Sequence, residues 1–205
     1  MSDTLFPEAT REMSNRRAAL APDTTKAFRD FSSAVFEDRA LSRKTKELIA
    51  VAVAHVKQCP YCIRGHTERA RSQGADKEEV MEAIWVAGAM RADGAYAHAE
   101  RAFVDQPETD RADLAPEVTE AFQDFSGEAF DEGALSVKTK QLLAVAVAHT
   151  TQCEYCIPVR AERAREAGAG DTEIMEAIWV AAEMRTGGSY AHAALALDVM
   201  ADGDE

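Results

Sequence analysis

The chain has 205 residues, enough for one large domain or two small domains with an adequate hydrophobic core. Its formal net charge is −13 and its pI is about 4.9, and this acidity argues against nucleic acid and anionic membranes as partners. The longest apolar run, residues 48–54, is too short to span a bilayer, and no signal sequence opens the chain. We therefore expect a soluble cytoplasmic protein.

Helical signals begin early in the chain. Residues 1–20 predict a polar lead-in with about one helical turn, and Pro22 opens a helix that runs to about Phe36. After a polar loop, Ser42 caps a helix that is apolar almost all the way round and ends near Val56. A helix of this kind is typical of the buried centre of a bundle.

The remaining elements of the first half are also helical. The next helix opens at a cysteine pair and is closed by Gly74, after which Asp76 and Glu79 form a capping box for another helix. We expect Gly94 to break that helix, leaving a short final helix over residues 95–103. No segment alternates with a period of two residues, so the sequence predicts an all-α fold.

The second half of the chain repeats the first at a constant offset. About two thirds of the positions in residues 41–98 are identical to those in residues 135–192, which indicates a tandem duplication. The equivalent pairs include Cys59 and Cys153, Cys62 and Cys156, His55 and His149, Trp85 and Trp179, and His98 and His192. The predicted parts are a lead-in (1–20), a first helical repeat (21–104), a linker (105–116) and a second helical repeat (117–205), with the repeats related by an internal pseudo-twofold.

Redox chemistry is indicated by the first cysteine pair. Pro60 follows Cys59 and is tolerated only in the opening turn of a helix, so Cys59 and Cys62 are expected at a helix N-terminus. Such a position favours a thiolate and can lower a thiol pKa from about 8.5 into the range ~3.5–7.5. His66 lies one turn after Cys62 on the same face, and Glu47, on the preceding helix, reaches the thiols if the two helices pack antiparallel.

Glu47, Cys59, Cys62 and His66 together resemble the signature of the alkylhydroperoxidase D-like group of the carboxymuconolactone decarboxylase superfamily. The resemblance extends over both halves of the chain and implies an AhpD-like all-helical fold. It also implies a peroxide-reducing dithiol in which Cys62 attacks the peroxide, Cys59 closes the disulfide, and Glu47 and His66 relay the proton. Tyr61 departs from the pattern, because the best-known peroxidase members have a histidine there.

The resemblance further implies the partners of the protein. These are a small-molecule peroxide and an external dithiol reductant, with no cofactor beyond the redox-active Cys59–Cys62 disulfide and no metal. Single-repeat members of the superfamily form trimers or hexamers, so three tandem chains are expected to close a comparable ring as a homotrimer.

The second cysteine pair lacks the acid–base residues of the first. Gln141 and Arg160 stand where the first repeat has its glutamate and histidine, and neither releases a proton near neutral pH. Pro158 follows Cys156 by two residues and should make this helix start later or bend. Cys153 and Cys156 are therefore either a degenerate, structural pair or a working dithiol that relies on Arg160 to stabilise a thiolate.

Other functions are compatible with the same residues. The two cysteine pairs could supply four sulfurs to zinc, or one pair with His66 or His55, in a non-catalytic scaffold, and a dithiol could also serve as a redox sensor. Carboxymuconolactone decarboxylase-like chemistry on a carbon acid is a third possibility, with Glu47 or a histidine as base, although the decarboxylase members generally lack the cysteine pair.

The residues left over from these motifs are interpreted as structural. We expect His55 and His149 to be hydrogen-bonded packing residues, and His98 and His192 to make cap or interface contacts. Trp85 and Trp179 are expected to anchor the core or a subunit contact, and Tyr61 and Tyr155 to line or shield the thiols.

Overall fold

A computed structural model of the protein describes residues 6, 10–106, 108 and 110–201. All regular secondary structure in this part of the chain is helical, which confirms the predicted all-α class. The elements are α1 (Arg11–Leu20), α2 (Pro22–Val35), α3 (Arg43–Lys57), α4 (Pro60–Ser72), α5 (Lys77–Ala97), η1 (Ala99–Phe103), η2 (Ala112–Leu114), α6 (Pro116–Phe130), α7 (Val137–Thr151), α8 (Cys156–Glu166) and α9 (Asp171–Ala201). None of the described helices is long and apolar enough to cross a membrane.

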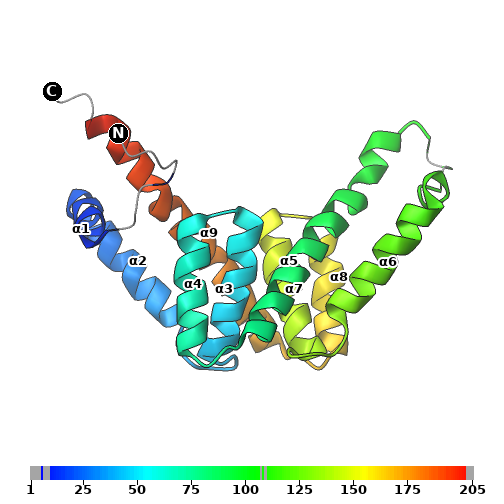
Figure 1. Ribbon diagram of the computed structural model, residues 1–205, viewed down its shortest axis with the longest axis horizontal. Coiled ribbons are helices and arrows are strands. Elements are labelled where there is room, and N and C mark those ends of the chain that lie inside the picture. Colours follow the sequence, from blue (N-terminus) through cyan, green and yellow to red (C-terminus); the bar gives the residue numbers. More distant parts are fainter. Residues whose placement is uncertain (1–5, 7–9, 107, 109, 202–205) are drawn as a thin grey trace.

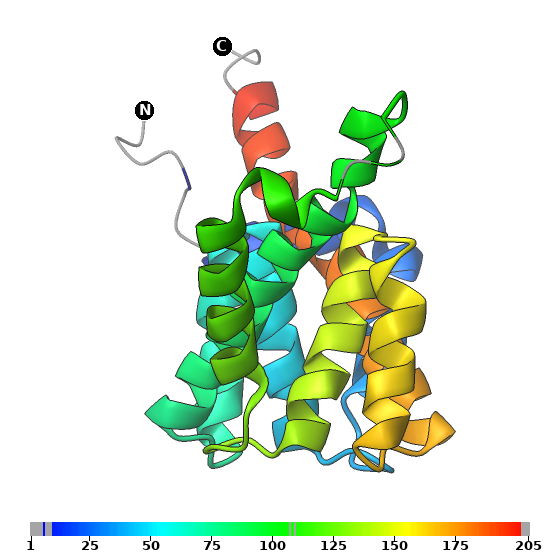
Figure 2. The same cartoon turned by 90° about the vertical axis from the view of Figure 1, so that its right-hand side faces the viewer.

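The helices form a central bundle with two diverging arms (Figure 1). The centre holds the pairs α3–α4 and α7–α8, and the view turned by 90° shows α7 and α8 side by side (Figure 2). One arm consists of the end of α9 with α1 and α2, and the other of the end of α5 with α6. The two halves thus have the same arrangement, as the predicted pseudo-twofold requires.

The core lies along α3 and α7, which pack against each other at the centre. Residues 49–54 of α3 and 143–148 of α7 are completely buried and consist of alanine, valine, leucine and isoleucine. Their small side chains allow close helix packing, and the burial of so many apolar groups is the main stabilising contribution. Each long helix packs against both central helices: α5 contacts α3 of its own repeat and α7 of the second, and α9 contacts α7 of its own repeat and α3 of the first.

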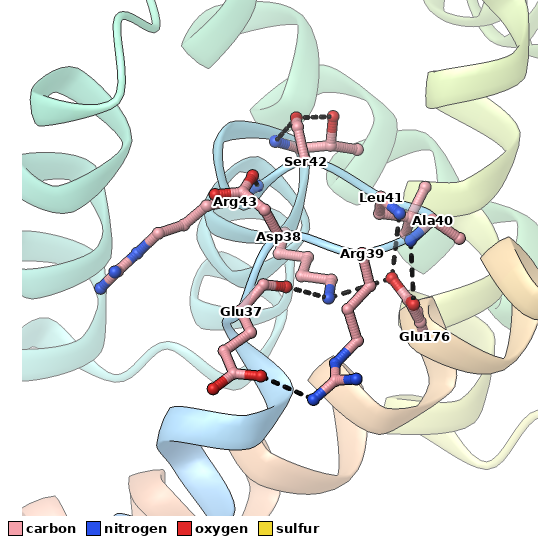
Figure 3. Close-up of polar contacts among 10 residues, drawn as sticks. Glu37, Asp38, Arg39, Ala40, Leu41, Ser42, Arg43 and Glu176 are labelled. Carbon is pink, nitrogen blue, oxygen red and sulfur yellow. Dashed lines mark hydrogen bonds and ion pairs between the residues drawn. The ribbon is translucent and has the colours of Figure 1, made fainter.

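A buried ion pair fastens the start of α9 to the first repeat (Figure 3). The Glu176 carboxylate accepts hydrogen bonds from the backbone N–H groups of Ala40 (3.2 Å) and Leu41 (2.9 Å). It also pairs with the Lys46 ammonium at 3.0 Å, and this lysine donates in turn to the Glu37 carbonyl at 2.6 Å. Lys46 is 1% exposed, so its charge is buried beside a partly buried partner.

The same contacts recur with the two repeats exchanged. The Glu82 carboxylate on α5 accepts from the N–H groups of Ala134 (2.8 Å) and Leu135 (2.9 Å) and pairs with Lys140 at 3.1 Å. Partial burial would raise the pKa of Glu82, but these hydrogen bonds and the lysine lower it below its ordinary value. Each long helix therefore binds the loop of the other repeat, as expected when two halves are related by a twofold axis.

Several predicted helix boundaries are confirmed. Ser42 caps α3 by accepting a hydrogen bond from the Thr45 N–H at 3.1 Å, and Asp76 and Glu79 form a complete capping box at the start of α5. Gly74 follows the end of α4 with a φ of +84°, a left-handed conformation that favours glycine.

Two expectations about local structure were wrong. Gly94 does not break its helix, because α5 continues to Ala97; one glycine costs a helix only about 1 kcal/mol, which packing overrides. The expected short helix over residues 95–103 is instead the end of α5 followed by the 3-10 turn η1.

The lead-in contains a ten-residue helix rather than a single turn. Thr10 caps α1, and Arg17 donates hydrogen bonds to the carbonyls of Tyr190 (2.8 Å) and Ala191 (3.0 Å) on α9 while lying over the Tyr190 ring. These partners are far away in the sequence, which is why the local pattern did not indicate a stable helix. Residues 1–5 and 7–9 of the lead-in lie outside the described residues.

Candidate active site

The first cysteine pair lies at the start of α4, where the sequence places it. Cys59 and Cys62 form a disulfide, with Cys59 as the N-cap residue. The Cys62 N–H points at Cys59 Sγ at 3.3 Å, so the helix N-terminus provides its donor to the first sulfur. Cys59 is 1% exposed and Cys62 is 8% exposed, which leaves Cys62 the more accessible of the two.

Glu47 and His66 are joined beside this disulfide. The Nδ1 atom of His66 and the Oε2 atom of Glu47 lie 2.8 Å apart in a hydrogen bond, because α3 and α4 pack against each other. Glu47 is 1% exposed and His66 is 7% exposed, so both groups are shielded from water. His66 lies one turn after Cys62, and within the described chain it is hydrogen-bonded to Glu47 and not to either sulfur.

A polar cavity of about 370 Å³ opens beside this pair. It is lined from the first repeat by Glu47, His66 and Arg69, and Arg69 Nε lies 3.4 Å from the Glu47 carboxylate. The second repeat adds one residue, Glu183, from α9. The remaining lining residues are Ser32, Ser33, Phe36, Glu37 and Arg43.

Glu183 is a buried acid that reaches the first repeat from the second. Ser32 Oγ donates to Glu183 Oε1 at 2.8 Å, while Oε2 has no hydrogen-bond partner among the described residues. Burial raises the pKa of Glu183 above its ordinary value, and Ser32, His66 and Arg69 offset this only in part. The fold therefore favours the neutral acid at this position.

Aromatic side chains pack against the tyrosine that lies within each cysteine pair. Tyr61, between the two cysteines, packs edge-on against His192 of α9 with ring centroids 5.9 Å apart, and Phe6 contacts both rings. In the second repeat Tyr155 packs in the same way against His98, at 5.1 Å. The expected interface contacts of these histidines are thus confirmed as contacts between the repeats.

The other structural expectations have mixed outcomes. His55 and His149 are hydrogen-bonded packing residues as expected, each through Nδ1 to a carbonyl four residues earlier at 2.8 Å. Trp85 and Trp179 do not belong to the core, because they are 53% and 48% exposed. Their assignment to a subunit contact stays a prediction.

The second cysteine pair has a different environment. Cys153 and Cys156 form a disulfide, and α8 begins at Cys156, later than α4 in its repeat, as expected from Pro158. Arg160 is 2% exposed; it pairs with Asp93 of α5 at 2.9 Å and lies over a phenylalanine ring. Burial lowers the pKa of Arg160 below its ordinary value, and Asp93 offsets this only in part; an ion pair thus stands where the first site has Glu47 and His66.

Some polar atoms of the second site remain unpaired. Gln141 Oε1 and the Nε and Nη1 atoms of Arg160 are buried without a hydrogen-bond partner in the described structure. Gln141 and Arg160 therefore do not form the bond that Glu47 and His66 form. The described residues also contain no group of three or more histidine, cysteine or acidic side chains placed to hold a metal ion.

The fold and the site define a class of protein: a duplicated, all-helical dithiol protein with one acid–base site and one charge-paired site. A sequence model of the carboxymuconolactone decarboxylase family matches residues 22–105 and again residues 116–199. The chain belongs to this family and contains two copies of its repeat.

Similar proteins fit this assignment. Uncharacterized protein 4 in the cox locus of Paracoccus denitrificans is 50% identical over 113 residues, which are 55% of this chain and the whole of that protein. An uncharacterized protein of Haemophilus influenzae is 43% identical over 49 residues, which cover 24% of this chain and 43% of that protein. The Paracoccus relative therefore has about the length of one repeat.

A solved structure supports the fold over the whole chain. A Burkholderia xenovorans protein, provisionally described as a gamma-carboxymuconolactone decarboxylase subunit, superposes with a TM-score of 0.77. The match covers 97% of this chain and 93% of that chain at 18% sequence identity. At this identity the likeness establishes the shared fold alone.

Proposed function

We propose that the protein is a thiol-dependent peroxide reductase that uses the Cys59–Cys62 pair for redox chemistry and Glu47 with His66 as proton relay. The single observation that carries the proposal is the buried 2.8 Å hydrogen bond between Glu47 and His66, one helical turn from Cys62. An acid–base pair in this position is able to take up a thiol proton away from bulk water.

The reaction proceeds in three steps. The Cys62 thiol gives its proton to the relay, and the thiolate attacks one oxygen of a hydroperoxide; the S–O bond forms as the O–O bond breaks, and the proton leaves with the alcohol. The Cys59 thiol then attacks the sulfenic acid, releases water and closes the disulfide. An external dithiol reduces the disulfide by thiol–disulfide exchange and completes the cycle.

The experiment follows peroxide consumption by the reduced protein with a dithiol reductant. Cys62→Ser should lose turnover because it removes the nucleophile, while the matched variant Cys156→Ser in the second repeat should keep most of it. Equal rates for the wild type and Cys62→Ser would reject the proposal.

Chemistry on a carbon acid is a second candidate, favoured by one observation. The 370 Å³ cavity is lined by Glu47, His66, Arg69 and Glu183 but by neither cysteine, so it could hold an organic acid beside the acid–base pair. Here Glu47 or His66 would act as base and the thiols would be incidental. In that case Cys62→Ser would retain activity on a lactone or β-keto acid, whereas Glu47→Gln would not.

We further propose that three chains assemble into a ring, a trimer with the form of a hexamer. Trp85 and Trp179 stand exposed at equivalent places, each beside a cavity, of about 420 Å³ and 330 Å³ respectively. Exposed aromatic residues next to hollows are typical anchors of protein contacts. Light scattering after size-exclusion chromatography should give three times the chain mass, and a monomer would reject the assembly.

A further inference from the structure

Helix α9 of the second repeat passes directly over the sulfur of Cys62. A side-chain carbon placed on Gly188 would lie 3.8 Å from Cys62 Sγ and 2.6 Å from Lys57 Nζ. At the second distance the ammonium would have to shift if this position carried a side chain, so the glycine leaves the space that the Lys57 ammonium occupies. The Lys57 ammonium and the Cys62 sulfur thus border the same point.

The second repeat holds Lys57 in this position. Lys57 is the last residue of α3, and its Nζ donates hydrogen bonds to the carbonyls of Met184 (3.1 Å) and Arg185 (3.0 Å) on α9. An ammonium has three donors and no acceptor, so one N–H is left after these two bonds. These two bonds therefore hold the lysine side chain in place and leave its third N–H group for the neighbouring sulfur.

The two sulfurs of the pair differ in what can stabilise their charge. The N-terminus of α4 directs an amide N–H at Cys59 Sγ, as described above, and no described backbone donor is directed at Cys62 Sγ. Yet Cys62 is the more exposed sulfur and carries the proposed attack. A cation beside Cys62 is the group that would complete its activation.

Other charged groups also face this place. Glu183 and Arg185 of α9 interact with Lys57, and Glu183 also interacts with His66 of α4 and Glu47 of α3. Partial burial and Arg185 lower the pKa of Lys57, while Glu183 raises it. A partly desolvated ammonium interacts more strongly with a neighbouring anion than a fully hydrated one.

The second site provides the contrast within the same chain. Thr151 occupies the position equivalent to Lys57, and Gly94 the position equivalent to Gly188. A side-chain carbon on Gly94 would meet nothing within 4 Å, so no cation fills that space. The lysine is one of the residues that distinguish the two sites.

We propose that the Lys57 ammonium stabilises the Cys62 thiolate and that the second repeat acts on the first site by holding Lys57 there. The thiol proton still passes to the Glu47–His66 relay, and Lys57 keeps all of its own protons. The inference rests on the proposed function only in taking Cys62 as the nucleophile.

The test measures thiol ionisation without peroxide. In the reduced full-length chain carrying Cys59→Ser, the rate of iodoacetamide alkylation of the Cys62 peptide is followed by mass spectrometry from pH 5 to 10. Lys57→Met should raise the midpoint by about one pH unit, the low end of what an opposite charge within 4–6 Å produces. Lys57→Arg should stay near the wild-type value.

Arg64→Met is the matched control, because it removes a cation from the exposed face of α4, where its side chain is 77% accessible. It should leave the midpoint unchanged. A midpoint in Lys57→Met equal to that in Arg64→Met would overturn the proposal.

If Lys57→Met does not fold, the reverse substitution in the second repeat still tests the proposal. Thr151→Lys should lower the alkylation midpoint of Cys156 in Cys153→Ser protein, and an unchanged midpoint there would count against the proposal. Because alkylation needs no peroxide, a failure of the peroxidase assay and a failure of this test are separate results.

Discussion

The two cysteine sites of this chain have similar scaffolds and different charged groups. Each lies at the start of a helix, under the long helix of the other repeat, and each holds a disulfide. The first has a neighbouring cavity lined by groups that can exchange protons, Glu47, His66 and Glu183, whereas the second has the ion pair of Arg160 and Asp93. The backbone geometry is therefore maintained in both repeats, while the side chains around the two cysteine pairs differ.

The largest expected effect comes from making the first site resemble the second. Glu47→Gln keeps the shape of the side chain but removes the base, so peroxide turnover should fall about 10²- to 10⁴-fold, the usual contribution of general acid–base catalysis. Steady-state kinetics of the purified variant measure the loss. Gln141→Glu in the second site is the control and should not raise turnover, because Arg160 there cannot accept a proton.

The second prediction separates structure from chemistry at the other site. Asp93→Ala leaves the buried guanidinium of Arg160 without its partner, which should destabilise the fold by about 3 kcal/mol. Urea unfolding monitored by circular dichroism gives this value. The exposed pair of Arg64 and Glu68 is the comparison, because Glu68→Ala should cost less than about 1 kcal/mol; equal losses would contradict a structural role for Arg160.

The smallest effect concerns Glu183. Burial raises the pKa of Glu183 in the folded protein. The protonated carboxyl therefore stabilises the folded state fully at a pH below the ordinary glutamate pKa. This stabilisation is lost as the pH rises through the raised pKa. Glu183→Gln keeps the acceptor for Ser32 and cannot ionise. The melting temperature of the variant should exceed that of the wild type by roughly 2–4 °C at pH 8, the effect of ~1 kcal/mol in a chain of this size, and by less at pH 4.5. A difference independent of pH would show that Glu183 is not the titrating group.

Local patterns were sufficient for most of the fold. The helical class, the caps at Ser42 and Asp76 and the late start of α8 follow from neighbouring residues, and the duplication follows from comparing the two halves of the sequence. The continuation of α5 through Gly94 and the length of α1 do not, because each depends on packing against segments far away in the sequence.

The sequence also predicted only part of the candidate site. The positions of Glu47, Cys59, Cys62 and His66 follow a spacing within two adjacent helices, whereas Glu183 and Lys57 matter through contacts between the repeats. One signal could have found them. Their equivalents are Ala89 and Thr151, so both are departures from the internal repeat, as Glu47 and His66 are.

The contact of each long helix with both repeats has an evolutionary consequence. In a pair of identical single-repeat chains arranged in this way, any substitution in the long helix would appear in both sites at once. Joining the copies in one polypeptide removes that constraint, so an acid could arise at position 183 while alanine stayed at position 89. Fusion of this kind permits one half to become a specialised support for the other without changing the ancestral shape.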